Sequence, residues 1–209
     1  MTEAEWSACG DCRDLLYLAE SRLRKWVGPR SPRLLSCAGC RLAWGNSPPD
    51  PPSRAAIEIA ERYCDGVSTR KELAATLCAA MAAYRAAGDA PLRNLRRAVA
   101  KATRPTDPMG GMFETLTIIS GGEYDSSKDE LVEMIRDVFG PRLLRPIVAD
   151  RAWFTPAAIY EERAFDRLPI LADALEGAGC TNADVLLHCR RPGEHVRGCW
   201  VVDLVLGKE

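Results

Sequence analysis

Apolar residues recur every three or four positions along most of the chain, which is the spacing of amphipathic α-helices. The clearest stripes are Leu73, Leu77, Met81 and Tyr84; Leu131, Ile135, Val138 and Phe139; and Leu168, Leu171 and Leu175. We expect burial of Leu131, Ile135, Val138, Leu171 and Leu175. The pattern predicts a mainly α protein, a bundle-like array of many helices.

Capping residues and helix-breaking residues mark where the predicted helices begin and end. Thr69 with Glu72, and Ser127 with Glu130, have the spacing of a capping box, in which each side chain accepts a hydrogen bond from the other residue's backbone. Gly140-Pro141 is predicted to end a helix. Further helices are predicted to begin at Pro91, Thr155-Pro156, Asp166, and Thr181 or Asn182.

Two segments depart from the helical pattern. Residues 113–119 are rich in β-branched side chains and roughly alternate, so they predict a short strand or an extended arm. Residues 200–206 also have strand composition, but Cys199, Val202 and Leu206 share one helical face, which favours a helix. We expect residues 199–206 to dock against 168–190, with Trp200 buried and Asp203 at the edge.

Two proline-rich interruptions divide the chain. Residues 46–53 contain four prolines, which remove backbone donors and fix φ, so we expect this stretch to be neither helix nor central strand. At residues 104–111 the charge balance also changes: residues 1–106 carry 17 basic and 11 acidic side chains, whereas residues 107–176 carry 7 and 14. We therefore predict an N-terminal helical region over 1–104, a linker over 105–112 and a C-terminal helical region over 113–209.

Composition narrows the class of protein. The 209 residues are 47% hydrophobic and carry a net charge of −1, which is ordinary for a globular chain. No apolar stretch approaches the roughly 18 residues of a membrane span, and no signal peptide is visible, so we expect no membrane association. Nine cysteines form an odd set in a chain that can fold without disulfides, which favours a cytoplasmic location.

The first candidate metal site combines two CxxC pairs, Cys9 with Cys12 and Cys37 with Cys40. Four thiolates suit tetrahedral zinc. However, the 24 residues between the pairs read as helices, and in a helix these cysteines would pack as small apolar side chains. Both interpretations stay open.

A second cluster lies near the carboxyl end. It contains the chain's two histidines, with candidate ligands His188, Cys189, His195 and Cys199, and Cys180 just before them. Imidazole and thiolate are zinc ligands, although adjacent His188 and Cys189 would point about 100° apart on a helix. The alternatives are local structure or a catalytic Cys/His pair.

A basic face is predicted on the helix that follows Pro91. Arg93, Arg97, Lys101 and Arg104 fall within an arc of about 80°. Such a face suits an anionic partner, and equally a solvated helix surface. The net charge near zero and the absence of interleaved aromatic residues argue against nucleic-acid binding.

Catalytic motifs are missing. The sequence contains no Gly-rich phosphate loop, GxSxG, HExxH or EF-hand, and helical spacing opposes no two carboxylates. An enzyme is therefore not the favoured class, and no cofactor other than zinc is indicated.

Several strings carry a family resemblance: Met1-Thr-Glu-Ala-Glu-Trp6, Ile135-Arg-Asp-Val-Phe-Gly140, Ile159-Tyr-Glu-Glu-Arg-Ala-Phe-Asp166 and His195-Val-Arg-Gly-Cys-Trp-Val-Val-Asp203. The chain resembles a paralogous family of small planctomycete bacterial proteins over residues 1–66 and 129–209. That family has no assigned activity, so the resemblance implies no mechanism. Its members usually keep a cysteine at the position of Cys9 but none at Cys12, which weakens the first zinc hypothesis.

Two functional hypotheses follow from these patterns. The leading one is a non-enzymatic, cytoplasmic helical protein that acts by interaction or regulation, with another protein as its partner. The alternative is a small zinc-binding protein that uses one of the Cys/His clusters.

Overall fold

The structure, a computed structural model, describes residues 2–26, 28–45, 49–88, 90–120, 129–144, 147 and 157–208. Its regular elements in these ranges are twelve α-helices and two short 3-10 helices, with no strand, so the mainly α prediction is confirmed. None of these helices is long and apolar enough to cross a membrane.

The chain forms two compact units. The first combines Met1–Gly28 with Asp129–Glu209, and the second is the continuous segment Pro29–Lys128. The predicted boundary at 105–112 therefore falls inside the second unit, where a helix already begins at Pro108. Each unit has its own buried apolar cluster.

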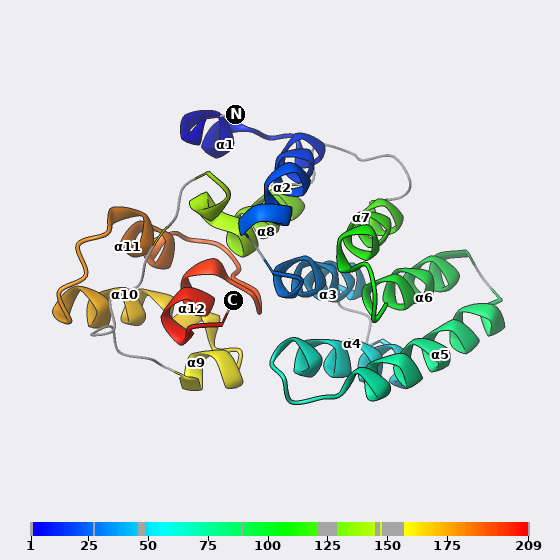
Figure 1. Ribbon diagram of the computed structural model, residues 1–209. Helices are drawn as coiled ribbons and strands as arrows, with labels where there is room; N and C mark the ends of the chain where they lie inside the picture. Colours follow the sequence, from blue (N-terminus) through cyan, green and yellow to red (C-terminus); the bar gives the residue numbers. More distant parts are fainter. Residues whose placement is uncertain are drawn as a thin grey trace. The chain divides into compact units, whose positions relative to one another are not determined.

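The described residues of the second unit form the helices α3 (Arg30–Trp44), α4 (Pro51–Cys64), α5 (Arg70–Ala86), α6 (Ala90–Ala102) and α7 (Pro108–Ile119) (Figure 1). Helix α7 packs against α3 and α6, and α4 packs against α5. Small side chains fill much of the core and let the helices approach closely: Cys37, Cys40, Ala56, Ala60, Ala80 and Ala98.

The strand predicted at 113–119 is wrong, because these residues belong to α7. Asp107 caps the helix by accepting a hydrogen bond from the amide of Gly110, and Pro108 opens it. Met112 and Leu116, one turn apart, are both fully buried. The hydroxyl of Thr117 donates a hydrogen bond to the backbone carbonyl of Phe113. Packing of a helical face has overridden the strand propensity of β-branched residues.

Three of the six predicted helix starts are observed. Thr69 and Glu72 form the capping box of α5, and Asn182 caps α11 (Ala183–Arg190) through the amides of Asp184 and Val185. Pro91 is the second residue of α6, as predicted. Helix α4 begins at Pro51, inside the interruption that was predicted to be non-helical, because proline is tolerated in a first turn.

One predicted cap is not observed. Asp166 lies in a 3-10 turn (Phe165–Arg167), and α10 (Leu168–Gly177) begins after Arg167 without a side-chain cap. The predicted starts at Ser127 and at Thr155-Pro156 lie outside the described residues.

The remaining helices of the first unit are α1 (Glu3–Ala8), α2 (Cys12–Trp26), α8 (Asp129–Phe139), α9 (Ala157–Glu161) and α12 (Trp200–Leu206). A 3-10 turn over Gly140–Leu143 follows α8. All five residues expected to be buried on α8 and α10 are at most 2% exposed, which confirms the predicted helix phases.

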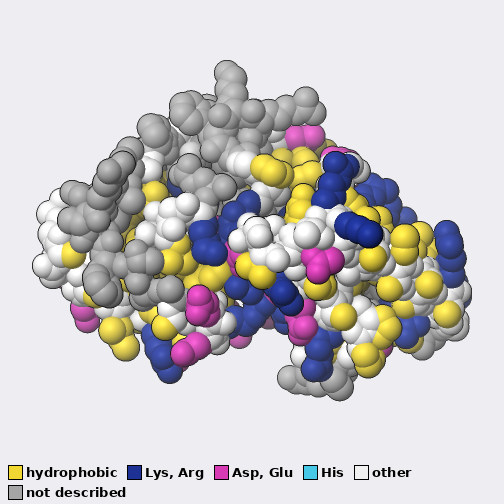
Figure 2. All heavy atoms as spheres, turned by 60° about the horizontal axis from the view of Figure 1, so that its bottom comes forward, with side chains coloured by type: hydrophobic (Ala, Val, Ile, Leu, Met, Phe, Trp, Pro, Cys, Tyr) yellow, Lys and Arg dark blue, Asp and Glu magenta, His cyan; other side chains and the backbone are white. Residues whose placement is uncertain are grey.

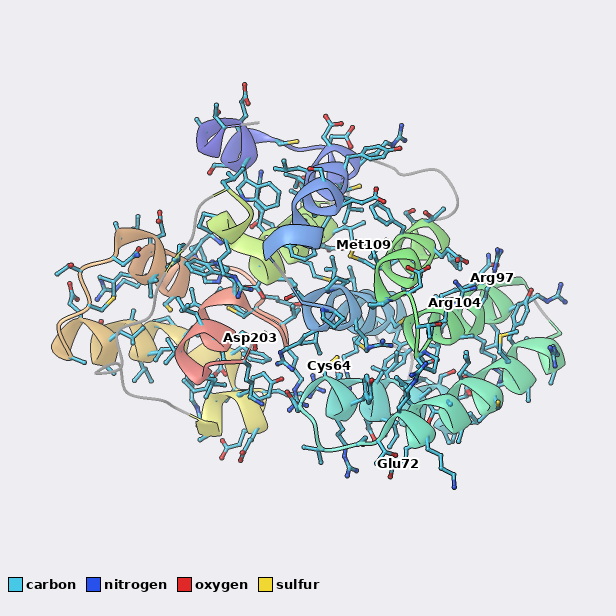
Figure 3. All side chains as sticks on the ribbon, in the orientation of Figure 1. Cys64, Glu72, Arg97, Arg104, Met109 and Asp203 are labelled. Carbon is cyan, nitrogen blue, oxygen red and sulfur yellow. The ribbon has the colours of Figure 1, made fainter. Side chains whose placement is uncertain are left out.

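The carboxyl-terminal segment is a helix that packs in the core of this unit. Trp200 is 1% exposed and belongs to the same apolar cluster as α10 and α11, as predicted. Asp203, labelled in Figure 3, is 1% exposed, so its predicted position at the edge is wrong.

Candidate metal centre

A buried group of four potential metal ligands lies within the first unit. Asp137 comes from the last turn of α8, and His188 from the last turn of α11. His195 lies in the connection after α11, and Cys199 is the N-cap residue of α12. One ligand atom from each lies within 4.8 Å of all the others. This group could hold a metal ion.

Asp137 is the centre of the group. Its Oδ1 lies 2.5 Å from His195 Nδ1 and 3.1 Å from His188 Nε2, and its Oδ2 accepts a 2.8 Å hydrogen bond from the amide of Val196. The carboxylate is completely buried, and the side chains of His188 and His195 are only 8% and 5% exposed. The group is therefore shielded from bulk solvent.

The environment of Asp137 favours its ionised form. Burial by itself would raise the pKa of this carboxyl group. Hydrogen bonds from His188 and His195, and their charge once acid protonates them, outweigh burial and lower the pKa to about 2. A buried carboxylate needs compensating partners, and here imidazole N–H groups and one backbone amide supply them.

His188 is held as a neutral imidazole. Burial lowers its pKa, although Asp137 acts in the opposite direction. Trp200 Nε1 donates a 3.0 Å hydrogen bond to His188 Nδ1. Because the indole nitrogen can only donate, Nδ1 must carry a lone pair and the ring proton must lie on Nε2. That proton points toward Asp137.

Cys199 is a protonated thiol in this arrangement. Its Sγ lies 3.2 Å from His188 Nε2. Burial and the nearby Asp137 carboxylate raise its pKa well above 9.0, while the amides of Val202 and Val201 act to lower it. A bound cation would reverse this preference, since metal ions deprotonate the thiols that ligate them.

Two glycines shape the backbone around the group. Gly198 has φ +100° in the turn between His195 and Cys199, a conformation that L side chains rarely adopt. Gly140 has φ +53°, and a Cβ built there would lie 2.5 Å from the indole of Trp200. Trp200 can therefore pack directly against the end of α8, which brings its N–H to His188.

A pocket of about 230 Å³ reaches the group from the surface of this unit. His188 and Trp200 contribute to its wall, together with Trp6, Arg136 and Leu187 among others. Arg136 donates to the backbone carbonyls of Ser7 and Cys9, at 2.8 and 2.7 Å, and so joins the end of α1 to α8. His188 is the member of the group that lines this pocket.

The structure gathers three of the four residues proposed from the second cluster. His188, His195 and Cys199 come together, but Cys189 is not part of the group. Its side chain is fully buried in the apolar core, which raises its pKa to about 12. The geometric objection to adjacent His188 and Cys189 as joint ligands therefore holds.

The two CxxC pairs lie in different units. Cys9 and Cys12 belong to the first unit, where Cys12 is buried at the start of α2. Cys37 and Cys40 are buried on α3 in the second unit, and burial raises the pKa of Cys40 to about 12. Zinc binding by these four residues together stays a prediction.

Asp137 is the member of the group that was not among the candidates predicted from the sequence. It lies beside the apolar stripe of α8, roughly 60° around the helix from Met134. An acid at the border of a buried stripe needs partners, and the chain has only two histidines. An acid beside an apolar stripe, together with two histidines, was the signal that the sequence offered. The sequence did not specify which acid would contact the histidines.

The predicted basic face on α6 is partly neutralised within its own unit. Lys101 and Arg104 both pair with Glu114 of α7. Arg93 donates to the carbonyls of Ala87 and Gly88 and stays exposed, as does Arg97. Figure 3 labels Arg97 and Arg104, and on the face drawn in Figure 2 the basic side chains are interspersed with acidic and apolar ones. Anion binding here stays a prediction.

Comparison with models of known protein families, with curated proteins and with solved structures finds no match for this chain. The site therefore has to be interpreted from its own chemistry.

Proposed function

We propose that this protein binds a divalent transition-metal ion, zinc first of all, through Asp137, His188, His195 and Cys199. The observation that carries the proposal is the convergence of four ligand atoms of the types zinc prefers within 4.8 Å of one another. The four residues come from three separate helices and a connecting loop. Local sequence proximity alone does not explain this convergence.

Charge supports a divalent ion. One carboxylate and one thiolate supply two negative charges, and two neutral imidazoles supply none. With a divalent cation the complete site would be neutral, which is what a buried location requires. A monovalent ion would leave a net negative charge.

The distances support tetrahedral coordination. Zinc–ligand bonds of about 2.0–2.3 Å place tetrahedral ligand atoms roughly 3.3–3.6 Å apart. His188 Nε2 lies 3.1 Å from Asp137 Oδ1 and 3.2 Å from Cys199 Sγ. The separation of 2.5 Å between His195 and Asp137 would have to open by somewhat less than about one ångström.

The hydrogen bond from Trp200 opposes metal binding, but only weakly. Coordination through His188 Nε2 requires the ring proton to move to Nδ1, which leaves the indole N–H without its acceptor. An unpaired buried donor costs about 1–3 kcal/mol. Structural zinc sites gain about 10–16 kcal/mol on binding, so the metal prevails.

We infer a structural site rather than a catalytic one. Four protein ligands complete a tetrahedral shell, whereas catalytic zinc keeps one position for water or substrate. The side chains of Asp137, His188 and His195 are at most 8% exposed, and Cys199 is completely buried. Little room is left for water or a substrate at the metal. The metal would tie α8, α11 and α12 together.

Metal analysis of the full-length protein, purified without chelator, tests this proposal. We expect about one equivalent of zinc per chain, whereas less than about a tenth would overturn it, given the tight binding of structural sites. The variants Cys199→Ser and His195→Gln should lose the metal. Cys189→Ala, which removes a neighbouring buried thiol outside the group, should retain it.

Cobalt substitution separates the two zinc hypotheses. The charge-transfer absorption of Co²⁺ grows with the number of thiolate ligands, and only one is present in the Asp/His/His/Cys group. A weak thiolate band abolished by Cys199→Ser supports our site. A strong band that survives in Cys199→Ser but disappears in Cys37→Ala would assign the metal to the two CxxC pairs.

An interaction protein is our second proposal, and it is compatible with a structural metal. Leu187 is 69% exposed at the border of the pocket, and Ile170 is 66% exposed on α10. Single exposed apolar residues are common, but Trp and Arg beside a pocket are typical of binding surfaces. If the unaltered protein self-associates in sedimentation experiments and the Leu187→Glu variant does so less, this proposal is supported.

A further inference from the structure

We propose that Trp200 lowers the metal affinity of the Asp137/His188/His195/Cys199 group, so that this structural site binds zinc about tenfold less tightly than its ligands alone would allow, and that the group keeps its hydrogen bonds when the metal leaves. The inference rests on the metal binding proposed above. It concerns a residue that is not itself a ligand. Trp200 acts by positioning the proton on His188.

The direction of one hydrogen bond sets this behaviour. In most metal sites the second nitrogen of a ligating histidine donates its proton to a carbonyl or carboxylate, which leaves the first nitrogen free for the metal. Here the second nitrogen, Nδ1 of His188, faces the donor Nε1 of Trp200 at 3.0 Å. The partner therefore stabilises the tautomer that cannot coordinate through Nε2.

The side chains of the group satisfy one another's hydrogen bonds. Nε2–H of His188 points at Asp137 Oδ1, His195 bonds the same oxygen, and the amide of Val196 donates to Oδ2. No ligand side chain is left with an uncompensated charge, because Asp137 receives all of these donors. Removing the metal should therefore leave the helices in place, unlike in zinc fingers, which unfold.

Metal uptake removes the acceptor of the Trp200 indole N–H. When the proton of His188 moves to Nδ1, this N–H is left unpaired, and Trp200 is only 1% exposed. The cost of the unpaired donor is what lowers the metal affinity. The close packing of Trp200 on Gly140 keeps the ring in place during this change.

The experiment combines two measurements on the full-length chain. In the metal-free protein, ¹⁵N NMR of the histidine side chains reports the tautomer of His188, and we expect Nε2–H. Competition with a chelating dye then gives the zinc dissociation constant. Trp200→Phe should bind zinc about tenfold more tightly, because the competing hydrogen bond is gone.

Controls address the packing change. Trp6 lines the same pocket but makes no hydrogen bond to the group, so Trp6→Phe should leave the dissociation constant unchanged. If Trp200→Phe folds poorly, replacing the Trp200 indole with benzothiophene removes the N–H and keeps the ring shape. This analogue should reproduce the tenfold gain.

The outcomes separate the two proposals. If the unaltered protein binds no zinc, the proposed function fails and this inference fails with it. If it binds zinc with the same dissociation constant as the Trp200 variants, or if metal-free His188 carries its proton on Nδ1, this inference alone is overturned. Loss of helical circular dichroism on chelation would also overturn it.

Discussion

Glu61 and Asp137 are buried acids in different units of the molecule, and they have different partners. Glu61 of α4 is 2% exposed and accepts two hydrogen bonds from Arg41, at 2.9 and 3.0 Å. Asp137 of α8 is completely buried and is bound by two imidazoles and an amide. Arginine keeps its charge and its protons, so the first pair is permanent. Imidazole can give up a proton and bind a metal, so only the second acid lies in a site that could change its state.

The largest expected effect comes from removing the two acids in turn. Asp137→Ala should lower the free energy of unfolding by about 3–5 kcal/mol, because it leaves buried N–H groups unpaired. Glu61→Ala should cost less, since Arg41 is 32% exposed and can be solvated. Urea denaturation with chelator present measures both. If both variants lost the same free energy of unfolding, Asp137 would be no more dependent on its partners than Glu61.

Apolar burial should not distinguish the units. Leu175 and Leu73 are each completely buried, one in each unit. Leu175→Ala and Leu73→Ala should each lower the free energy of unfolding by about 2–5 kcal/mol. A much smaller loss for either variant would mean that its site collapses around the missing side chain. The same urea experiment provides the comparison.

Acid should destabilise the first unit through His188 and Asp137. Both have folded-state pKa values below their usual ones, so the unfolded chain binds more protons during acidification. Stability should begin to fall below pH 6.5 as His188 protonates on unfolding. A further loss of about 2 kcal/mol should follow between pH 3.8 and about 2 as Asp137 protonates.

The test uses metal-free protein and thermal denaturation at a series of pH values. In Asp137→Asn the step between pH 3.8 and about 2 should be absent. Persistence of the full step in this variant would assign the acid sensitivity to other carboxylates.

The smallest effect concerns the basic face of α6. Glu114→Gln removes the acid that pairs with Lys101 and Arg104, both partly exposed, so stability should change by at most about 1 kcal/mol. The variant should nevertheless be retained more strongly on immobilised heparin. Unchanged retention would argue against an anionic partner for this face.

The helices were largely predictable because their signals are local. The Thr69/Glu72 capping box and the apolar stripe of α8 depend on residues three or four positions apart. The error at 113–119 arose because strand propensity is also local, whereas the burial of Met112 and Leu116 depends on α3 and α6. Likewise, Asp203 is polar, and its burial depends on contacts that sequence spacing does not encode.

Only part of the site could be predicted. His188, His195 and Cys199 lie within a dozen residues, so their ligand types were visible together. Asp137 lies 58 residues before His195 and meets it only through the packing of α8 in this unit. The donor role of Trp200 could not be predicted at all, since a buried tryptophan is ordinarily interpreted as core.

The first unit is assembled from both ends of the chain, with Pro29–Lys128 between its two parts. On the ribosome, α1 and α2 emerge first, but α8, against which α2 packs, follows roughly 100 residues later. At about 5–20 residues per second, this is a delay on the order of ten seconds. The second unit, being continuous, can fold during that interval. Until α8 is synthesised, the apolar face of α2 has no helix α8 to pack against and stays exposed on the nascent chain.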